Sequence, residues 1–588
     1  MDDLKGKSYL HIDLTHEQYE IRKTDLNTTG NYPSGIALAT FLLSVTLPAG
    51  TDPMSPDNVL VFAPGMFAGT PYPGATRVAI ASKSPLTGLW AGGTMGGGFA
   101  WALSQTGWDA VVIQGRASSL SYLLLDEGRV FFRNARDIEG CFFSETRRKL
   151  EETWGEDAGV LCIGPAGESQ MKFANLQDGF PEASVRGGMG AVFGAKNLKA
   201  LVVRPYVPIN TGKAEAFLEA VLPSIKGARE TESAHSFEMQ TPHALRKLNH
   251  LDALPSRNFQ AAGFSEEWFN ALESLDTQKR SCPGCPYACI YTVLSKEDSE
   301  RPENRVAVPI DPEHLWALGP LLDVTELDES LKTLRACQEY GIAPVSLGIL
   351  AAWMAECREK NIDLGIGLDL EPKFGDGSWL PGLPGRITEN PVIRDVLARG
   401  VSEAAKRIGP GSEVFAMHFC GEGLSFIDLR RGFWPLSFLG PAVLIPAQNN
   451  GFPSDYWLTA DGNHKMIQVE NHWALLESIG ICKRVGMAQR NFHENLLPLC
   501  QLVSVHSGAE EFVKEWGEKC VKLIQAFNWR EGWRPQNLCL PRRFLEEELA
   551  TPQHVYPALD AGRWLECMKH YFTLRGWSAE GDPGDTQP

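Results

Sequence analysis

The sequence predicts an α+β protein in which a β-rich N-terminal domain is followed by two mostly α-helical domains. With 588 residues the chain is longer than one hydrophobic core usually serves, so several domains are expected. Residues 1–208 combine Gly and Pro with short apolar runs, whereas much of the remaining chain repeats apolar residues at helical spacing. We therefore predict domains at 1–208, 209–412 and 413–588.

Turn-forming residues bound the short apolar runs of the first domain. The runs at 59–62, 109–114 and 122–125 have the length and composition of buried strands. A charged stretch at 144–154 predicts a helix, and 198–204 predicts a last buried strand. Together these elements predict a strand-dominated α+β unit.

Apolar residues at helical spacing predict the main elements of the rest of the chain. The Pro-rich stretch 282–289 is expected to be a loop between helices, and the Pro- and Gly-rich stretch 364–386 a long surface connection. The predicted helices span 213–226, 327–338, 349–360, 392–407, 471–480 and 510–527.

The overall composition excludes some classes of function. A net charge of -17 argues against nucleic acid as a partner and against docking on anionic membranes. The acidic surface would suit a basic partner, although solubility alone also explains it. The chain has no run of about 18 apolar residues and no apolar region after Met1. We therefore expect a cytoplasmic protein without a membrane span.

Cysteine spacing is the sharpest local signal of chemistry. The 13 cysteines are an odd number in a long chain, which fits reduced thiols or metal ligands better than disulfides. Cys282, Cys285 and Cys289 lie on one short Pro-constrained loop, so their thiolates can converge on one centre. Iron–sulfur clusters take such thiolates with a distant fourth ligand. Zinc sites, which more often show two Cys-x-x-Cys pairs, and unligated buried cysteines are the alternatives.

Further motifs recur along the chain from about residue 5 to residue 585. They are Arg77 with Lys-Ser-Pro-Leu-Thr-Gly at 83–88, Ile-Gly-Pro-Ala-Gly-Glu at 163–168, the Gly-rich stretch 186–199, Pro-Glu-His-Leu-Trp-Ala-Leu-Gly at 312–319, Glu-Ser-Ile-Gly-Ile-Cys at 477–482, and the stretches 540–547 and 571–577. Taken with the cysteine loop and in one register, they resemble the tungsten-containing aldehyde:ferredoxin oxidoreductase family.

The resemblance implies the cofactors. It implies one [4Fe-4S] cluster bound by Cys282, Cys285, Cys289 and Cys482. It also implies tungsten held by two pterin dithiolenes on the first domain, with molybdenum as the alternative metal and Mg²⁺ at the pterin phosphates as a further candidate ion. The residues expected to bind the pterins are Arg77, Thr94, Gly96, Gly97, Arg186, Gly187, Gly188, Gln338 and Glu477.

Elementary chemistry is consistent with these assignments. Guanidinium groups such as those of Arg77 and Arg186 bind phosphate bidentately. Gly-Gly turns such as Gly187-Gly188 let backbone N–H groups approach a phosphate or a pterin ring. On their own, however, the glycine runs are more typical of tight turns in a β-rich domain.

The match departs from the family at two places. Gln338 replaces the Asp of the first Asp-x-x-Gly-Leu motif, although its amide can still hydrogen-bond a pterin edge, and the second motif carries Glu477. The stretch 424–440 has no His, where catalytic members carry one near tungsten, and Pro435 aligns with that position. His418 and His314 are expected to be structural. The apolar segment 432–446 either lines a pocket for a bulky substrate or fills a cavity.

Three functional hypotheses follow. In the first, the chain oxidises a small aldehyde to a carboxylate, Glu313 is the general base, and electrons leave through the cluster to ferredoxin or an iron–sulfur partner subunit. In the second, the same cofactor reduces an activated acid or an aromatic thioester. In the third, the chain is a non-catalytic, cluster-bearing subunit of a redox complex. Lys332 and Arg335 replace the ligands of a metal that bridges some family dimers, so other contacts would make a homo-oligomer or hetero-complex.

Overall fold

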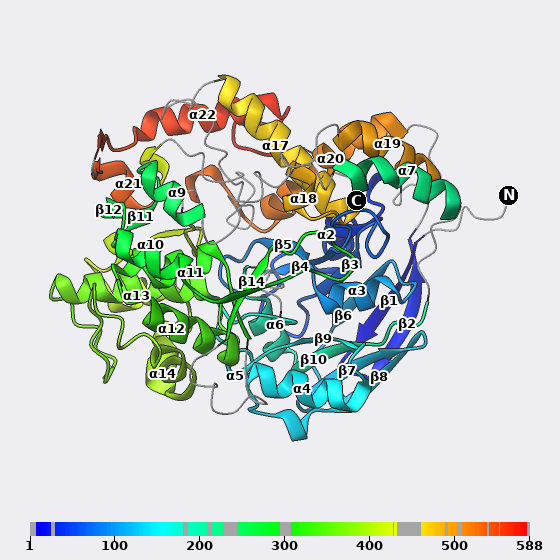
Figure 1. Cartoon of the computed structure of the whole chain (residues 1–588), viewed down its shortest axis with the longest axis horizontal. Helices are drawn as coiled ribbons and strands as arrows, with labels where there is room; N and C mark the ends of the chain where they lie inside the picture. The colour runs from blue at the N-terminus through cyan, green and yellow to red at the C-terminus, as the bar shows by residue number, and fades with distance from the viewer. Residues whose placement is uncertain are drawn as a thin grey trace.

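The computed structural model describes most of the chain, and Figure 1 shows how its parts are arranged. The β-rich first part lies on one side, the helices of the middle part lie on the other, and helices of the last part lie across the top in that view. The described residues are 7–24, 30–179, 186–207, 214–227, 244–294, 307–426, 428–431, 460–488, 492–503, 509–537, 540–551 and 553–584.

A six-stranded sheet forms the base of the first part, in the order β2-β1-β6-β3-β4-β5. Strands β1 and β6 are parallel, and the other neighbouring pairs are antiparallel. The predicted strands at 59–62 and 109–114 are confirmed as β3 and β6. The strands are β1 (Ser8–Asp13), β2 (Gln18–Lys23), β3 (Leu60–Pro64), β4 (Val78–Lys83), β5 (Trp90–Met95) and β6 (Ala110–Gln114).

Alternation along these strands gives the sheet two apolar faces. Val61 belongs to the core that the sheet shares with α2 and α20, and the next residue, Phe62, belongs to the core that it shares with α3 and α6. Trp90 of β5 joins α20, because its backbone N–H donates to Oδ1 of Asn528 at 2.9 Å. These helices are α2 (Gly35–Thr46), α3 (Gly98–Ser104), α6 (Met189–Ala195) and α20 (Ala509–Arg530).

A second, four-stranded sheet has the order β8-β7-β10-β9, with β7 parallel to β10. The predicted strands at 122–125 and 198–204 are confirmed as β7 and β10, and the helix at 144–154 is confirmed as α4. The bounds are β7 (Ser121–Asp126), β8 (Arg129–Asn134), α4 (Phe143–Trp154), β9 (Gly159–Cys162) and β10 (Leu198–Val203).

Helices dominate the remaining chain, as predicted, with one correction. The single helix expected at 392–407 is two helices, α15 and α16, because Gly400 between them has a φ of +87° that a helix interior does not allow. The other five predicted helices are confirmed, although α13 and α17 begin earlier than expected. The main helices are α7 (Ala214–Gly227), α10 (Glu266–Glu273), α11 (Pro312–Leu318), α12 (Leu327–Tyr340), α13 (Pro344–Glu359), α14 (Leu383–Glu389), α15 (Pro391–Leu397), α16 (Val401–Ile408), α17 (Ala460–Ile479), α18 (Lys483–Ala488), α19 (Phe492–Val503) and α22 (Ala561–Leu574).

The cysteine-containing stretch 282–289 is a loop, but its predicted place between helices is wrong. It joins β13 (Thr277–Arg280) to β14 (Ile290–Leu294), which pairs in turn with β15 (Ala307–Ile310). The four residues of β13 are polar and lack an apolar alternation, so only the pairing with β14 makes them a strand. Strand β15 leads directly into α11, the helix that carries Glu313.

The stretch 364–386, predicted as a surface connection, is partly buried against the main core. Ile366, Phe374, Trp379 and Leu380 are buried and belong to the main core, and α14 already begins within the stretch. Apolar residues spaced irregularly among Pro and Gly give no periodic signal, so the sequence does not reveal these anchors.

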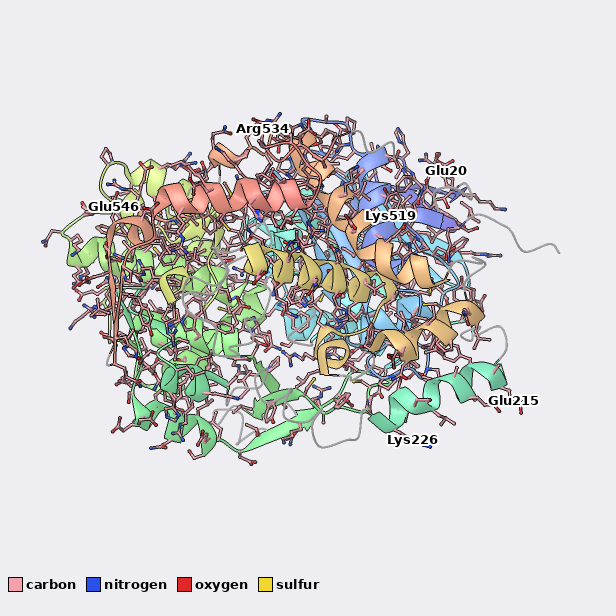
Figure 2. The ribbon with its side chains drawn as sticks, turned by 90° about the horizontal axis from the view of Figure 1, so that it is seen from above. Glu20, Glu215, Lys226, Lys519, Arg534 and Glu546 are labelled. Atoms are coloured by element: carbon pink, nitrogen blue, oxygen red, sulfur yellow. The ribbon has the colours of Figure 1, made fainter. Side chains whose placement is uncertain are left out.

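The charged side chains labelled in Figure 2 come from elements that are far apart in the sequence. Glu20, Lys519 and Glu546 belong to separate elements and are exposed. Glu215 and Lys226 stand near opposite ends of α7, in the order that the helix dipole favours. Within the described residues, no helix combines the length and apolar character needed to cross a membrane.

Candidate active site

The four cysteines predicted to bind a cluster come from two distant segments that meet. Cys482 packs in a small apolar group with Cys285 and Cys289. Cys282 lies against the end of β5, where a Cβ added to Gly96 would be 3.0 Å from the Cys282 Sγ. Because Gly96 has no side chain, the cysteine loop can approach the end of β5 this closely.

Backbone contacts place Cys482 on the first domain. The Cys482 N–H donates to the carbonyl of Gly74 at 2.8 Å, and the Arg77 N–H donates to the carbonyl of Gly480 at 3.2 Å. Gly480 ends α17 with a φ of +80°, and a Cβ there would lie 2.8 Å from the Cα of Gly65. A glycine is thus required where the two segments cross.

Arg77 faces the cysteines, and its Nη2 donates to the Cys482 Sγ at 2.8 Å. Only 4% of Arg77 is exposed, so its charge acts with little screening by water. Burial raises the pKa of the Cys285 thiol to about 12, the neighbouring Cys482 and Cys289 add to the rise, and Arg77 opposes it. Because metals bind thiolates, a cation at this place favours the ligand form of the cysteines.

The arrangement of the cysteines differs from that of a site for a single metal ion. Among the described residues, no group of three or more His, Cys, Asp and Glu side chains could hold one metal ion. A cubane is larger than one ion, because irons and inorganic sulfides lie between its four thiolate ligands. Four thiols from two segments, with a guanidinium beside one of them, are compatible with a cubane. The ligand set Cys282, Cys285, Cys289 and Cys482 stays a prediction.

Arg186 lies between two carboxylates from different segments. Its Nη1 donates to Oε1 of Glu313 at 3.3 Å, and its Nη2 lies 3.5 Å from Oε1 of Glu422. The same Nη2 donates to the backbone carbonyl of Gly423. The exposed fractions are 16% for Arg186, 19% for Glu313 and 2% for Glu422. Two acidic groups therefore share one cation in mostly dry surroundings.

The start of α11 fixes the position of Glu313. Asp311 caps the helix, since its Oδ1 accepts from the Glu313 N–H at 2.9 Å, and Pro312 occupies the first helical position. The other Asp311 oxygen lies 3.3 Å from Nη2 of Arg484. Arg484 follows Cys482 by two residues, so one ion pair joins the segment of the fourth cysteine to the segment of Glu313.

Glu422 was not found from the sequence. It lies on β17 (Glu422–Gly423), which pairs with β16 (His418–Phe419) across a tight turn. Ser346, in the first turn of α13, donates its hydroxyl to Oε1 of Glu422 at 3.3 Å. Among the described residues, Oε2 of Glu422 is buried and has no hydrogen-bond partner. Burial raises the pKa of Glu422, and the charge of Glu313 adds to the rise, while Arg186 and Ser346 oppose it.

The glycines predicted to bind the pterins lie at close contacts between chain segments. Gly187 and Gly188 have φ values of +96° and +79°; a Cβ on Gly187 would lie 2.6 Å from the Cβ of Ala91 on β5. Thr94, on the same strand, pairs with Ala79, and Gly97 caps α3 with a φ of +98°. The tight turns anticipated from these runs are present, whereas their contacts to a pterin stay predicted.

Two observations fit a polar ring near these elements. Oε1 of Gln338, at the end of α12, is buried without a partner among the described residues, and an amide oxygen there would accept from a pterin N–H. A Cβ added to Gly98 would meet no atom within 4 Å. Glu477, the carboxylate of the second motif, lies 3.2 Å from Nζ of Lys483. Gln338 therefore offers an acceptor of the kind that a pterin N–H needs, whereas the Glu477 carboxylate is paired with Lys483.

His418 has a structural contact of the kind expected, whereas the structural role of His314 stays a prediction. The Nδ1 of His418 accepts from the Gly421 N–H at 3.3 Å, inside the β16–β17 hairpin. Burial, helped by the charge of Lys406, lowers the pKa of His418 to about 4. His314 lies in α11, next to Glu313. The segment 432–446, with the predicted Pro435 position, lies outside the described residues.

Two family models match nearly the whole chain. The N-terminal domain model of aldehyde ferredoxin oxidoreductase matches residues 9–205. The model of domains 2 and 3 of the same family matches residues 224–587.

Individual relatives agree with the family models. The tungsten-containing aldehyde ferredoxin oxidoreductase of Pyrococcus abyssi is 29% identical over 563 residues, which cover 90% of this chain and 89% of that protein. The Pyrococcus furiosus protein of the same name is 26% identical over 607 residues, with coverages of 97% and 96%. The WOR-like subunit of the Pyrococcus furiosus aliphatic sulfonate oxidoreductase is 25% identical over 453 residues, with coverages of 72% and 71%.

A solved structure confirms the fold class. The active site complex BamBC of benzoyl coenzyme A reductase, in complex with 1,5-dienoyl-CoA, superposes with a TM-score of 0.82 at 22% identity. The superposition covers 99% of this chain and 96% of that chain. The α+β architecture with a β-rich first part is therefore confirmed, whereas the domain boundaries at 208 and 412 stay predictions.

Proposed function

Because the chain belongs to the aldehyde ferredoxin oxidoreductase family and is an oxidoreductase of that type, we propose that it oxidises a small aldehyde to a carboxylate. The observation that carries the proposal is the contact of the Glu313 carboxylate with the Arg186 cation at 3.3 Å, which supports a role of Glu313 as the general base. Its link through Asp311 and Arg484 to the cysteine segment joins base and redox residues in one site.

Two cofactors complete this proposal. Cys282, Cys285, Cys289 and Cys482 would hold a [4Fe-4S] cluster, with Arg77 against the sulfur of Cys482. Arg186, Gln338 and Glu477, with the glycine turns at 96–97 and 187–188, would bind the two pterin dithiolenes of a tungsten centre. When bound, that centre supplies the two-electron acceptor for the substrate carbon. The metal analysis described below distinguishes molybdenum from tungsten, and it also tests for Mg²⁺ at the pterin phosphates.

The residues of the chain would handle the protons. An aldehyde and one water yield a carboxylate, three protons and two electrons, as one C–O bond forms and the aldehyde C–H bond breaks. The Glu313 carboxylate takes a proton from the water or the aldehyde hydrate. Arg186 holds the Glu313 side chain in place through their contact at 3.3 Å. Oxidised ferredoxin or an iron–sulfur subunit accepts the electrons.

A second candidate reaction is the reduction of an activated acid or an aromatic thioester at the same site. The sequence at 424–440 has no histidine and contains aromatic residues at 433–438, a composition that suits a bulky substrate. The solved structure with the same fold is described as a complex of benzoyl coenzyme A reductase with a dienoyl-CoA. Assays with aliphatic aldehydes, aromatic aldehydes and aromatic coenzyme A thioesters, run side by side, separate the two reactions.

The first test is the metal content of the protein, purified without oxygen from a host that supplies the cofactor. About one tungsten or molybdenum and four irons per chain are expected. Irons without either metal would point to the cluster-bearing, non-catalytic subunit instead. Zinc in place of iron would overturn the cluster as well.

The second test is the substitution Glu313→Gln. We expect the rate of aldehyde-dependent dye reduction to fall about 10²- to 10⁴-fold, because the base is lost, while the metal content stays the same. Glu326→Gln, at an exposed glutamate before α12, is the matched control and should retain full activity. Full activity of Glu313→Gln would contradict the role of this residue.

A further inference from the structure

Glu356 and Glu422 are buried glutamates that face arginines, but they differ in how completely their oxygen atoms are paired. Glu356 has both oxygens bonded: Arg543 donates to each, at 2.5 and 3.1 Å, and Asn258 donates to Oε2 at 2.7 Å. Glu422 has contacts to Oε1 alone, and its buried Oε2 has no partner among the described residues. An ionised carboxylate is expected to have the surroundings of Glu356, and those of Glu422 fit a neutral acid.

From this difference we propose that Glu422 carries a proton on Oε2 in the resting site and is a positioning residue for Glu313, because it leaves the charge of Arg186 to that base. The protonation of Glu422 is independent of the proposed function. Its effect on Glu313 rests on the proposed function.

The distribution of the proton follows from the shared cation. Two carboxylates around one guanidinium repel each other, so one of them takes up a proton more readily than an isolated acid does. Glu313 is closer to Arg186, at 3.3 Å against 3.5 Å, and more exposed to water. Glu422 is almost completely buried, which raises its pKa. Glu422 is therefore the partner that keeps the proton.

The elements packed around β17 contribute no second cation to Glu422 among the described residues. Helix α13 contributes the neutral Ser346. The charges on α16 that act nearby, Glu403 and Lys406, act on His418 of the adjoining strand. Arg186 and Glu313 are thus the charged groups that set the protonation of Glu422.

Ionisation of Glu422 would change the site. Its new charge would compete for Arg186 and draw the guanidinium away from Glu313, so Glu313 would lose the contact that positions it. The protonated form of Glu422 consequently preserves the contact between Arg186 and Glu313. The substitution Glu422→Gln preserves the shape of the neutral acid and has no proton to lose, so it isolates this effect.

Infrared spectroscopy tests the proton directly, without any substrate. We expect the wild-type protein at pH 7 to show the C=O stretch of a buried protonated carboxyl group, and Glu422→Gln to lack it. Glu356→Gln, at the fully paired glutamate, is the matched control and should retain the band. Persistence of the band in Glu422→Gln would overturn the proposal. Absence of the band from the wild-type protein would also overturn it, and this measurement does not depend on the production of any variant.

Stability against pH gives a second readout. Because the pKa of Glu422 is raised in the folded protein, its stabilising contribution is present at low pH and is lost as the pH rises through the folded pKa. The melting temperature of wild type relative to Glu422→Gln should therefore fall across that window. A difference that is constant with pH would count against the protonated state.

Activity distinguishes the two proposals. If aldehydes are oxidised, Glu422→Gln should move the alkaline limb of kcat/KM upward by about one pH unit or more, because the variant has no proton to lose. An unmoved limb would overturn the positioning role. If no variant oxidises aldehydes but the infrared band behaves as expected, the proposed function fails and the protonated Glu422 stands.

Discussion

The two arginines predicted to bind pterin phosphates lie in different electrostatic surroundings. Arg77 is buried and donates to the sulfur of Cys482. Arg186 is partly exposed and lies between the carboxylates of Glu313 and Glu422. The guanidinium group of Arg77 therefore faces a sulfur atom, whereas the guanidinium group of Arg186 faces two acids. The residues proposed to handle electrons and those proposed to handle protons are thus separate, so single substitutions should affect the two groups separately.

The largest effect is expected at the cysteine side. Cys482→Ser removes the fourth predicted cluster ligand, which follows α17 in the chain and packs against the loop at 282–289. Most of the roughly four irons per chain should therefore be lost. Iron analysis and the visible absorption of the purified protein measure this. Cys500→Ala, at another buried cysteine, should keep its iron. A full complement of iron in Cys482→Ser would remove this residue from the ligand set.

At the carboxylate side, Arg186→Gln should lower the rate at neutral pH by about 10- to 100-fold. A nearby cation favours the charged form of an acid, so its removal should move the acidic limb of the rate profile to higher pH, and activity should partly recover there. Arg257→Gln is the control, because Arg257 also lies between two carboxylates, those of Asp323 and Glu359, but at the surface. A uniform loss at every pH would mean that Arg186 acts structurally.

Arg77→Gln should instead change the electron chemistry. Loss of a charge-assisted hydrogen bond to Cys482 Sγ, worth about 1.5–3 kcal/mol, corresponds to a reduction potential lower by roughly 60–130 mV for a one-electron couple. A redox titration followed by electron paramagnetic resonance measures the potential. Arg186→Gln should leave it unchanged. Equal shifts in both variants would remove the distinction between the two sides.

The smallest effect concerns the hairpin that carries Glu422. Because burial lowers the pKa of His418 to about 4, its stabilising contribution is present above the ordinary histidine pKa and is lost as the pH falls toward 4. At pH 5 the wild type should therefore lose about 1–2 kcal/mol of stability relative to His418→Gln, compared with pH 7.5. Urea unfolding at both pH values measures this. The exposed His554→Gln should show no such dependence.

Local pattern was informative where one face of an element is buried. The strands at 59–62 and 198–204 and helices such as α12 were recognised from short apolar runs or helical spacing. Strand β5 was missed, because Gly92 and Gly93 weaken its strand signal. Helix α2 was missed because apolar residues lie on all its sides, which removes the period. Gly400 shows the reverse case, a continuous helical pattern interrupted by one positive φ.

The spacing of the cysteines predicted the cluster loop, whereas Glu313 and both arginines were predicted only from motifs that resemble the family; the roles of these residues stay predictions. Glu422 stands in no such motif. Its character depends on burial, on Ser346 of α13 and on the distance to Arg186, more than two hundred residues away along the chain. Burial and shared charge arise only when distant segments pack, and they decide which of two chemically identical carboxyl groups carries the proton.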